Sequence, residues 1–305
     1  MQSPIGVRGT QPGTPTWNPS DSTSAQIIGS SNSPIFRNTT ANLPLPNYRL
    51  FIKGLIMAKD KSTKKNQSSS TAPVAAAAQP PNWPLFKPAL PVVQLSPEAP
   101  IPGLEDKIIL LRSFWPKNIC RDYVNFLKSL PLTTTPGRPK RGEALRVNDR
   151  FQVDDLRFSQ RLWLETGLKD VILEESVRHL WGGDVVGLNP NIRVYRYSKG
   201  QYFDCHYDDS NLVDLPSTRE PSGTISTKTT WTLLLYLTST TEGCVGGETV
   251  FYPHDRKSRK EEIAIAPETG LLLLHKHGDD CLLHEGREVT AGEKWIIRTD
   301  LCVKK

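Results

Sequence analysis

The sequence is short of the residues that build secreted scaffolds and membrane spans. Its five cysteines are scattered, odd in number and form no C-x-x-C pair, which excludes a disulfide framework and fits a reducing compartment. No apolar run reaches the roughly 18 residues of a membrane span. The opening stretch, MQSPIGVRGTQPGTP, has no apolar core of the secretory type. We therefore expect a cytoplasmic or nuclear protein that is not secreted and has no membrane partner.

Hydrophobic residues are also scarce, at 37%, while prolines number 25, which indicates that part of the chain does not fold. Residues 1–92 are rich in Ser, Thr, Pro, Asn, Gln and Ala without periodicity, so we expect a disordered basic tail. The tail carries nine Lys or Arg and two Asp, a net +7, which leaves −1 of the total +6 for residues 93–305. Because the folded part has no basic excess, we expect no nucleic-acid partner.

Residues 93–305 have the patterns of a folded domain in two parts. Residues 113–186 show helical spacing after Pro116 and a run of helix formers over 154–181 with a break at Gly167, which predicts helical support. Residues 187–303 hold short apolar segments separated by turn signals. Strands are expected within 192–197, 202–208, 229–238, 247–252, 262–267, 270–276, 280–286 and 293–303. Helices followed by antiparallel strands predict an α+β fold with a sandwich-like or barrel-like core.

One of these strands, in GQYFDCHYDDS, places His206 and Asp208 two positions apart. On a strand the two side chains share a face, so an imidazole and a carboxylate would converge. Chance supplies about 0.6 such H-x-D/E matches in a chain of this composition, so the pair alone is weak. His284 ends another apolar segment 76 residues after Asp208. Two histidines and one carboxylate suit non-haem Fe(II) with open positions, but zinc would accept the same ligands.

Four motifs then occur in order: VYRYSKGQYFDCHYD, LLLYL, GGETVF and LLHEGREVTAGEKWIIRTD. Together they resemble the prolyl 4-hydroxylase-type Fe(II)/2-oxoglutarate-dependent dioxygenases over roughly residues 105–303, most strongly over 190–302. The resemblance implies a double-stranded β-helix, or jelly roll, backed by helices. It implies the cofactors Fe(2+), 2-oxoglutarate and O2, with L-ascorbate as reductant. It also implies hydroxylation of an unactivated C–H bond in a small-molecule or peptidyl substrate, a prolyl residue being the family's default.

The resemblance gives roles to individual residues. His206, Asp208 and His284 would bind iron, and Lys294 would pair with the far carboxylate of 2-oxoglutarate, which is costly to bury alone. Arg298 shares a strand face with Lys294 and offers bidentate geometry, so it is the second candidate for that anchor.

Tyr197 and Tyr236 match tyrosines that hydrogen-bond the cosubstrate, the alternative being ordinary half-buried strand tyrosines. His275 and His277 form a second i, i+2 pair on a strand, an alternative ligand pair that no carboxylate motif completes.

The stretch ALRVNDRFQVDD brings Arg146, Asn148 and Arg150, which could line the substrate entrance or lie in a solvated loop. Two other functions remain open on the residues alone. One is a zinc-dependent hydrolase with the same three ligands, and the other is a non-catalytic binding module on this scaffold. The oligomeric state is not indicated.

Overall fold

A computed structural model describes residues 79–135, 137, 139, 142–217 and 223–305. Its α-helices are α1 (Lys117–Leu127), α2 (Leu156–Leu164) and α3 (Leu168–Ile172). Single-turn 3-10 helices follow at Arg178–Trp181, Thr240–Glu242 and Gly278–Asp280. The strands up to the H-x-D motif are β1 (Pro97–Glu98), β2 (Ile108–Leu111), β3 (Thr133–Thr134), β4 (Arg146–Val147), β5 (Asp149–Asp154), β6 (Val185–Leu188), β7 (Asn191–Ser198) and β8 (Tyr202–His206). The strands after it are β9 (Leu212–Pro216), β10 (Thr224–Tyr236), β11 (Val245–Gly246), β12 (Thr249–Tyr252), β13 (Ile263–Ile265), β14 (Leu272–Lys276), β15 (Leu283–Gly286), β16 (Val289–Ala291) and β17 (Glu293–Lys304).

The strands form two main antiparallel sheets. The large sheet runs β1-β2-β14-β10-β17-β7-β5-β3, with β6 also paired to β17 and β9 to β10. The small sheet runs β13-β12-β15-β8-β4. Sequence neighbours such as β14 and β15 therefore lie in different sheets, as in a jelly roll, and the expected fold class is confirmed.

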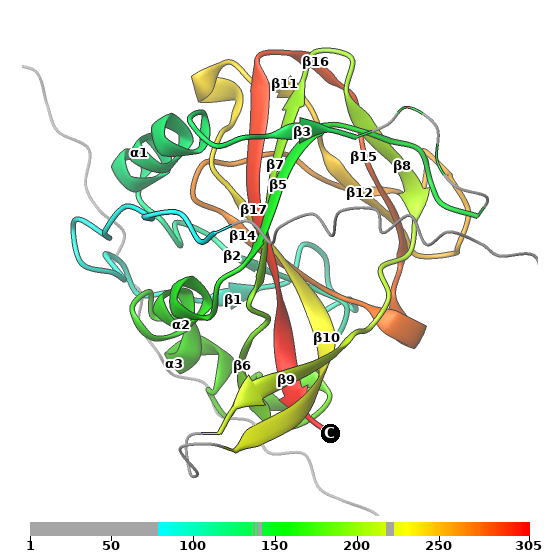
Figure 1. Cartoon of the computed structure of the whole chain (residues 1–305). Helices are drawn as coiled ribbons and strands as arrows, with labels where there is room; N and C mark the ends of the chain where they lie inside the picture. The colour runs from blue at the N-terminus through cyan, green and yellow to red at the C-terminus, as the bar shows by residue number, and fades with distance from the viewer. Residues whose placement is uncertain (1–78, 136, 138, 140–141, 218–222) are drawn as a thin grey trace, which may run out of the picture. The chain divides into compact units, whose positions relative to one another are not determined.

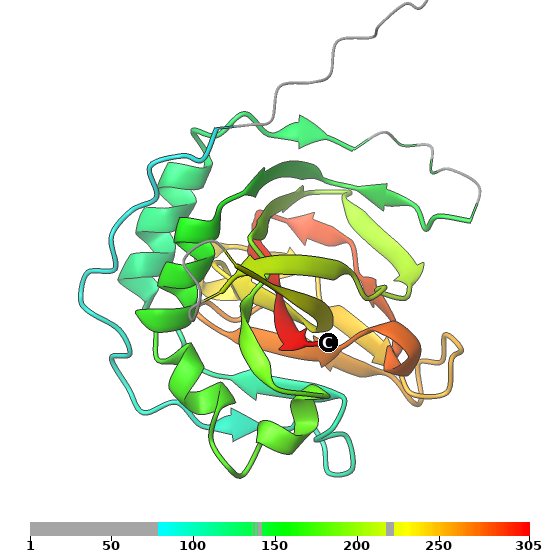
Figure 2. The same cartoon turned by 60° about the horizontal axis from the view of Figure 1, so that its bottom comes forward.

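The domain has three layers, which are the helices, the large sheet and the small sheet, and an apolar core lies between each layer and the next. Helices α1 to α3 cover one face of the large sheet, outside the barrel (Figure 1 and Figure 2). The larger core fills the space between these helices and that sheet, and includes Trp163, Leu233 and Ile297. The smaller core lies between the two sheets and includes Leu273 and Phe251. Side chains alternate across each strand, so every second residue of β7, β10, β14 and β17 points into the barrel.

The helices begin and end where local chemistry predicts. Pro116 precedes the first residue of α1 with extended backbone, and Asp155 caps α2 by accepting the backbone N–H of Phe158. Gly167 separates α2 from α3 at a φ of 77°, in the left-handed region that glycine tolerates. The expected break at Gly167 is therefore present. No helix of the described residues is long and apolar enough to cross a membrane.

The expected tail boundary at residue 92 is wrong, because residues 79–92 pack against the domain. Trp83 stacks on Phe158 with ring centroids 4.0 Å apart, and its indole N–H donates to Asp155 at 2.8 Å. Phe86 packs on Trp115. This proline-rich segment has no helical or strand periodicity, so aromatic anchors rather than a regular pattern attach it. The rest of the expected disordered tail, residues 1–78, lies outside the described residues.

Residues 113–186, expected to form helical support, also contain strands. They contain β3, β4 and β5, and β5 pairs with β7 to extend the large sheet. The segment FQVDD was not recognised as a strand, because only three of its residues alternate clearly before the cap at Asp155. The strands expected after residue 187 are all present, and β6, β9, β11 and β16 are additional.

Candidate active site

Three candidate metal ligands meet at the mouth of the barrel, on the side of the small sheet. His206 ends β8, and its direct partner across the antiparallel pair is His284 on β15. The Nε2 atom of His206 lies 3.9 Å from Oδ1 of Asp208, and Nε2 of His284 lies 3.8 Å from Oδ2 of Asp208. The ligand atoms of the three residues all lie within 4.8 Å of one another.

Asp208 reaches this position differently from the expectation. It does not lie on the strand with His206, because β8 ends at His206. The loop after β8 is held by backbone bonds, since the Asp208 carbonyl accepts the N–H of Gly278 at 2.8 Å. The carboxylate is buried and accepts a hydrogen bond from Thr232 at 2.9 Å. A loop, rather than strand alternation, therefore presents the carboxylate.

Hydrogen bonds fix the orientation of both imidazoles. Nδ1 of His206 lies 2.8 Å from the carbonyl of Asp204, and Nδ1 of His284 lies 2.9 Å from the carbonyl of Leu282. A carbonyl can only accept, so both Nδ1 atoms carry the proton. Both Nε2 lone pairs are then free to bind a metal, the arrangement that backbone carbonyls impose on metal-binding histidines.

The protonation states also suit a divalent metal. Burial lowers the pKa of His206 to about 3, so its ring is neutral at neutral pH. Burial acts to raise the pKa of Asp208, but Arg298 and the nearby imidazoles outweigh it and hold that pKa well below its usual range. Two neutral imidazoles and one carboxylate are the donor set that Fe(II) accepts while keeping open positions.

Lys294 is a buried cation at the other end of the barrel interior. Its side chain on β17 is 3% exposed, and its Nζ lies 5.6 Å and 5.2 Å from the ring centroids of Tyr197 and Tyr236. Its hydrogen bond among the described residues is a long one of 3.5 Å to Thr249. Burial lowers the pKa of Lys294 to about 8. The structure thus brings together Lys294 and both candidate tyrosines around an ammonium group that has no carboxylate partner in the described part of the chain.

Arg298 lies on the same face of β17, four residues from Lys294, or ~13 Å along the strand. Its guanidinium contacts Asp208, with Nη2 3.0 Å from Oδ2 and Nη1 3.2 Å from Oδ1. It also approaches Asp300 at 3.6 Å. The structure therefore places Arg298 beside the candidate metal ligands and not beside Tyr197 and Tyr236, which favours Lys294 as the anchor.

The second histidine pair splits between two environments. His277 is bonded through both nitrogens, to Thr232 at 2.9 Å and Thr229 at 3.0 Å. His275 is 2% exposed, and neither of its ring nitrogens has a hydrogen-bond partner among the described residues. Its Nε2 lies 3.6 Å from Oδ2 of Asp208, so one member of the pair borders the candidate metal site.

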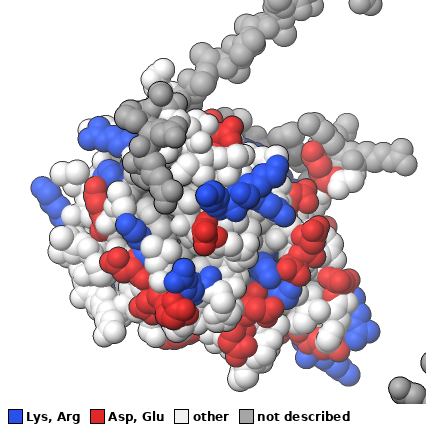
Figure 3. Space-filling view, turned by 90° about the horizontal axis from the view of Figure 1, so that it is seen from below, with Lys and Arg blue, Asp and Glu red and all other residues white. Residues whose placement is uncertain are grey.

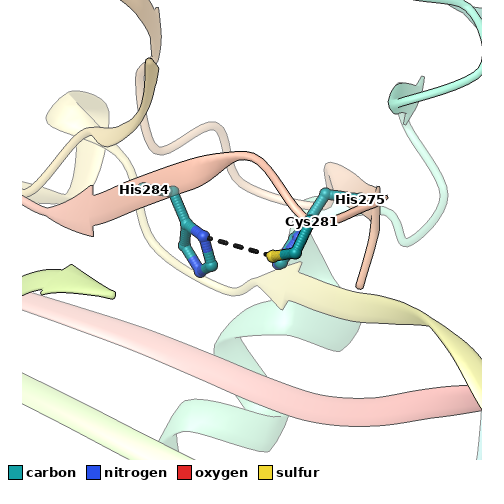
Figure 4. Close-up of side chains that lie close together, drawn as sticks. All are labelled: His275, Cys281 and His284. Carbon is teal, nitrogen blue, oxygen red and sulfur yellow. Dashed lines mark hydrogen bonds between the residues drawn. The ribbon is translucent and has the colours of Figure 1, made fainter. Parts of the chain in front are cut away.

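His275, Cys281 and His284 form a second close group (Figure 4). Cys281 faces Nδ1 of His284 at 3.9 Å, the nitrogen whose proton is donated to Leu282. Burial raises the pKa of the Cys281 thiol to about 12. This group shares His284 with the first set of candidate ligands.

An open cavity of about 1570 Å³ leads to the candidate ligands and is lined in part by His206, Asp208, Arg298, Arg146 and Arg150. Two of the three candidate entrance residues therefore line it. The third, Asn148, is fully buried and exchanges hydrogen bonds with Thr135 instead.

Sequence reasoning missed three residues that shape the site. Thr232 bonds Asp208, and Phe203 stacks on the ring of His206 at 3.6 Å. Asp300 is fully buried and approaches Arg298. Alternation along β10 and β17 could have identified Thr232 and Asp300, since they share the inward face with Tyr236 and Arg298.

Comparisons with known proteins agree with this geometry. Residues 192–299 match the family model described as the 2OG-Fe(II) oxygenase superfamily. Prolyl 4-hydroxylase 2 of Arabidopsis thaliana is 31% identical over 170 residues, which cover 48% of this chain and 53% of that protein. The chain thus spans about half the length of this curated relative.

Among solved structures, a Pseudomonas putida prolyl-4-hydroxylase matches with a TM-score of 0.45 at 13% identity, over 65% of this chain and 93% of that one. The viral collagen prolyl hydroxylase of Paramecium Bursaria Chlorella virus-1 matches with a TM-score of 0.42 at 20% identity, over 65% and 96%. These TM-scores are below 0.5, so the resemblance to known proteins rests on the sequence matches. All three candidate metal ligands and Lys294 lie inside the matched segment, so residues 192–299 resemble the 2OG-Fe(II) oxygenase superfamily at the positions that form the candidate site.

Proposed function

We propose that this protein is an Fe(II)- and 2-oxoglutarate-dependent dioxygenase that hydroxylates an unactivated C–H bond, in the manner of a prolyl 4-hydroxylase, on a peptidyl substrate. The observation that carries the proposal is the pairing of two features in one barrel. One is a pair of neutral imidazoles with free Nε2 atoms beside the carboxylate of Asp208. The other is the buried ammonium group of Lys294, which has no carboxylate partner among the described residues.

Each residue has a physical task in this reaction. His206, Asp208 and His284 would hold the metal and leave positions open on the cavity side. Iron bound there would supply O2 activation, coupled to conversion of 2-oxoglutarate into succinate and CO2 with the second oxygen atom going to the substrate. Lys294 would pair with the far carboxylate of 2-oxoglutarate, which would remove the cost of leaving either charge buried alone.

The surrounding groups would orient the cosubstrate and exclude water. Tyr197 and Tyr236 surround the ammonium group of Lys294 with aromatic faces. Leu234, Leu273 and Ile296 belong to the buried core between the two ends, so a cosubstrate held there would be shielded from solvent. L-Ascorbate is proposed as the reductant that keeps the metal in its ferrous state.

The two alternatives fit less well. A zinc hydrolase would use the same three ligands, but a buried Lys294 between two tyrosines would have no task in it. A non-catalytic binding module would not require both imidazoles to be held with Nε2 free.

The test supplies isotopically labelled dioxygen, Fe(II), 2-oxoglutarate and a library of proline-containing peptides to the full chain. The proposal predicts one labelled atom in the peptide and one in succinate, in equal amounts. A hydrolytic product whose oxygen comes from water would overturn it and favour the zinc enzyme.

A further inference from the structure

We infer that the cavity beside the candidate metal ligands recognises a carboxylate of the substrate through Arg146 and Arg150, so that the substrate is a peptide with an acidic residue close to the hydroxylated position. This inference rests on the proposed function, because it names the substrate class of the same cavity.

The two arginines come from different sheets and meet at one cavity. Arg146 lies on β4, the edge strand of the small sheet, and Arg150 lies on β5 of the large sheet. Both line the cavity that holds His206 and Asp208. A ligand in the cavity would therefore contact cations from both walls of the barrel mouth.

Arg146 is held close to the candidate metal ligands by aromatic rings. Its guanidinium carbon lies 5.0 Å from the ring centroid of Phe203 and 5.6 Å from that of Tyr195. The ring of Phe203 in turn stacks on His206, with centroids 3.6 Å apart and planes 21° apart. Aromatic faces orient a guanidinium group and leave its N–H donors available to an anion.

Arg150 is a partly buried cation among other cations. Its side chain donates to the neutral amide of Gln152. Burial lowers its pKa, and the nearby charges of Arg146 and Arg193 act in the same direction. Like charges gathered in a partly buried site repel one another, and an anion bound between them would relieve that repulsion.

The other two arginines of the cavity are already neutralised. Arg193 pairs with Asp300, and Arg298 pairs with Asp208 and approaches Asp300. Among the described residues, Arg146 and Arg150 make ring and amide contacts and form no ion pair. These two are therefore the cations that a substrate carboxylate would meet.

Three acidic residues line the cavity besides the buried Asp208. Glu143, Asp154 and Asp209 line it and are exposed, and Asp154 already accepts a hydrogen bond from Asn191 at 2.7 Å. On the face in Figure 3, the basic and acidic side chains of the described residues are interspersed without a broad basic patch. Selection for an acidic substrate would therefore arise inside the cavity, by short-range bidentate contacts.

The experiment compares two fluorescent proline-containing peptides that differ only in Glu or Gln beside the proline. Binding to the full chain, loaded anaerobically with Fe(II) and 2-oxoglutarate, is followed by fluorescence anisotropy. We expect the acidic peptide to bind at least about tenfold tighter. This preference should fall to less than about threefold in Arg150→Gln and in Arg146→Gln. The matched control is Lys199→Gln, an exposed residue outside the cavity lining, which should keep the full preference.

Competition distinguishes a peptide from a free acid. Unlabelled acidic peptide should displace the probe, whereas free glutamate at the same concentration should not. If free glutamate displaces the probe as well as the peptide does, the substrate is not recognised as a peptide. Equal binding of the Glu and Gln peptides, or a preference that survives both arginine substitutions, would overturn the inference. Affinity for 2-oxoglutarate, measured on the same samples, tests the proposed function separately, since it depends on Lys294 rather than on the peptide.

Discussion

Lys294 is a buried cation without an anionic partner among the described residues, so a bound anion would stabilise it. A buried ammonium group costs several kcal/mol unless an anion accompanies it, and Lys294 has only a 3.5 Å contact with a threonine hydroxyl among the described residues. Lys294→Ala should therefore leave the far carboxylate of 2-oxoglutarate unpaired, at a cost of about 3–5 kcal/mol, or roughly two to four decades in affinity. Calorimetric titration of 2-oxoglutarate at fixed Fe(II) measures this change, and Lys294→Arg should recover part of the affinity.

Substitution of Arg298 should affect metal binding more than 2-oxoglutarate binding, the reverse of the result expected for Lys294. Because it contacts Asp208 through both Nη atoms, Arg298→Ala should lower metal affinity and stability more than it lowers 2-oxoglutarate affinity at saturating metal. If Lys294→Ala binds the cosubstrate like the wild type and Arg298→Ala does not, Lys294 is not the anchor, although 2-oxoglutarate would still be the cosubstrate.

The lowered pKa of Lys294 predicts a pH dependence with a definite sign. The ammonium form binds the carboxylate, and with a pKa of about 8 it is lost as the pH rises through that value. Affinity for 2-oxoglutarate should be flat below about pH 7.5 and then fall by up to about tenfold per pH unit until the pKa of the complex is reached. In Lys294→Arg, whose side chain stays charged, the same titration should be flat. A wild-type profile that is also flat to about pH 9.5 would show that Lys294 is not the anchor.

His275 should behave differently from its neighbour His277. Both nitrogens of His275 lack a partner among the described residues, whereas those of His277 bond two threonines. His275→Phe should leave the free energy of unfolding of the metal-free protein unchanged or higher, since an unpaired buried polar group costs about 1–3 kcal/mol. It should also reduce the extra stability conferred by Fe(II) and 2-oxoglutarate. His277→Phe, the matched control, should destabilise the metal-free protein, and equal losses in both variants would contradict this account.

At the level of elements, the turn between β11 and β12 positions Lys294. Gly247 has a φ of 74°, and a Cβ there would lie 2.9 Å from Val289 and 3.1 Å from Cδ of Lys294. Gly247→Ala should therefore displace the lysine and weaken 2-oxoglutarate binding while metal binding persists. Gly243→Ala is the control, because it has a similar φ of 87° but no atom within 4 Å of the added Cβ. Equal cosubstrate affinity in the two variants would contradict the crowding argument.

The segment before β1 should be part of the folding unit. Trp83 stacks on Phe158 and bonds Asp155, so Trp83→Ala should cost about 3–5 kcal/mol in the free energy of unfolding. Deleting residues 1–78 should leave the denaturant midpoint unchanged, whereas deleting residues 1–92 should lower it markedly. A chain that tolerates the longer deletion would show that this packing contributes little.

The strands of the barrel were predictable because each has its own alternation of apolar and polar residues. The same alternation predicted that His206, His284 and Lys294 lie on strands of the barrel. Contacts that depend on how the sheets meet were not predictable. Nothing local in the sequence places Arg298 on Asp208 or His275 beside them, because those approaches are set by the register of β14, β10 and β17. The packing of residues 79–92 was missed for the related reason that aromatic anchors on an irregular segment leave no periodic signal.

For the whole molecule, the fold separates the tasks of the proposed reaction. The helices and the larger core brace the outer face of the large sheet, while its inner face carries Lys294 near one end and Arg298 toward the other. The small sheet supplies His206 and His284 as cross-strand partners. A loop delivers Asp208, and the open cavity admits the substrate from that side. Binding of the cosubstrate would thus depend on the large sheet, and binding of the metal would depend on the small sheet and the loop that carries Asp208.

The proposed function requires this barrel to bind Fe(II) and 2-oxoglutarate together. It is tested most directly by adding Fe(II) and then 2-oxoglutarate to the metal-free full chain without oxygen, while recording the visible spectrum. We predict a weak metal-to-ligand charge-transfer band that saturates at one equivalent of each. The band should be absent in His284→Ala and should require far more 2-oxoglutarate in Lys294→Ala. Stoichiometric zinc in the purified protein, together with no band after reconstitution with iron, would contradict the proposed function.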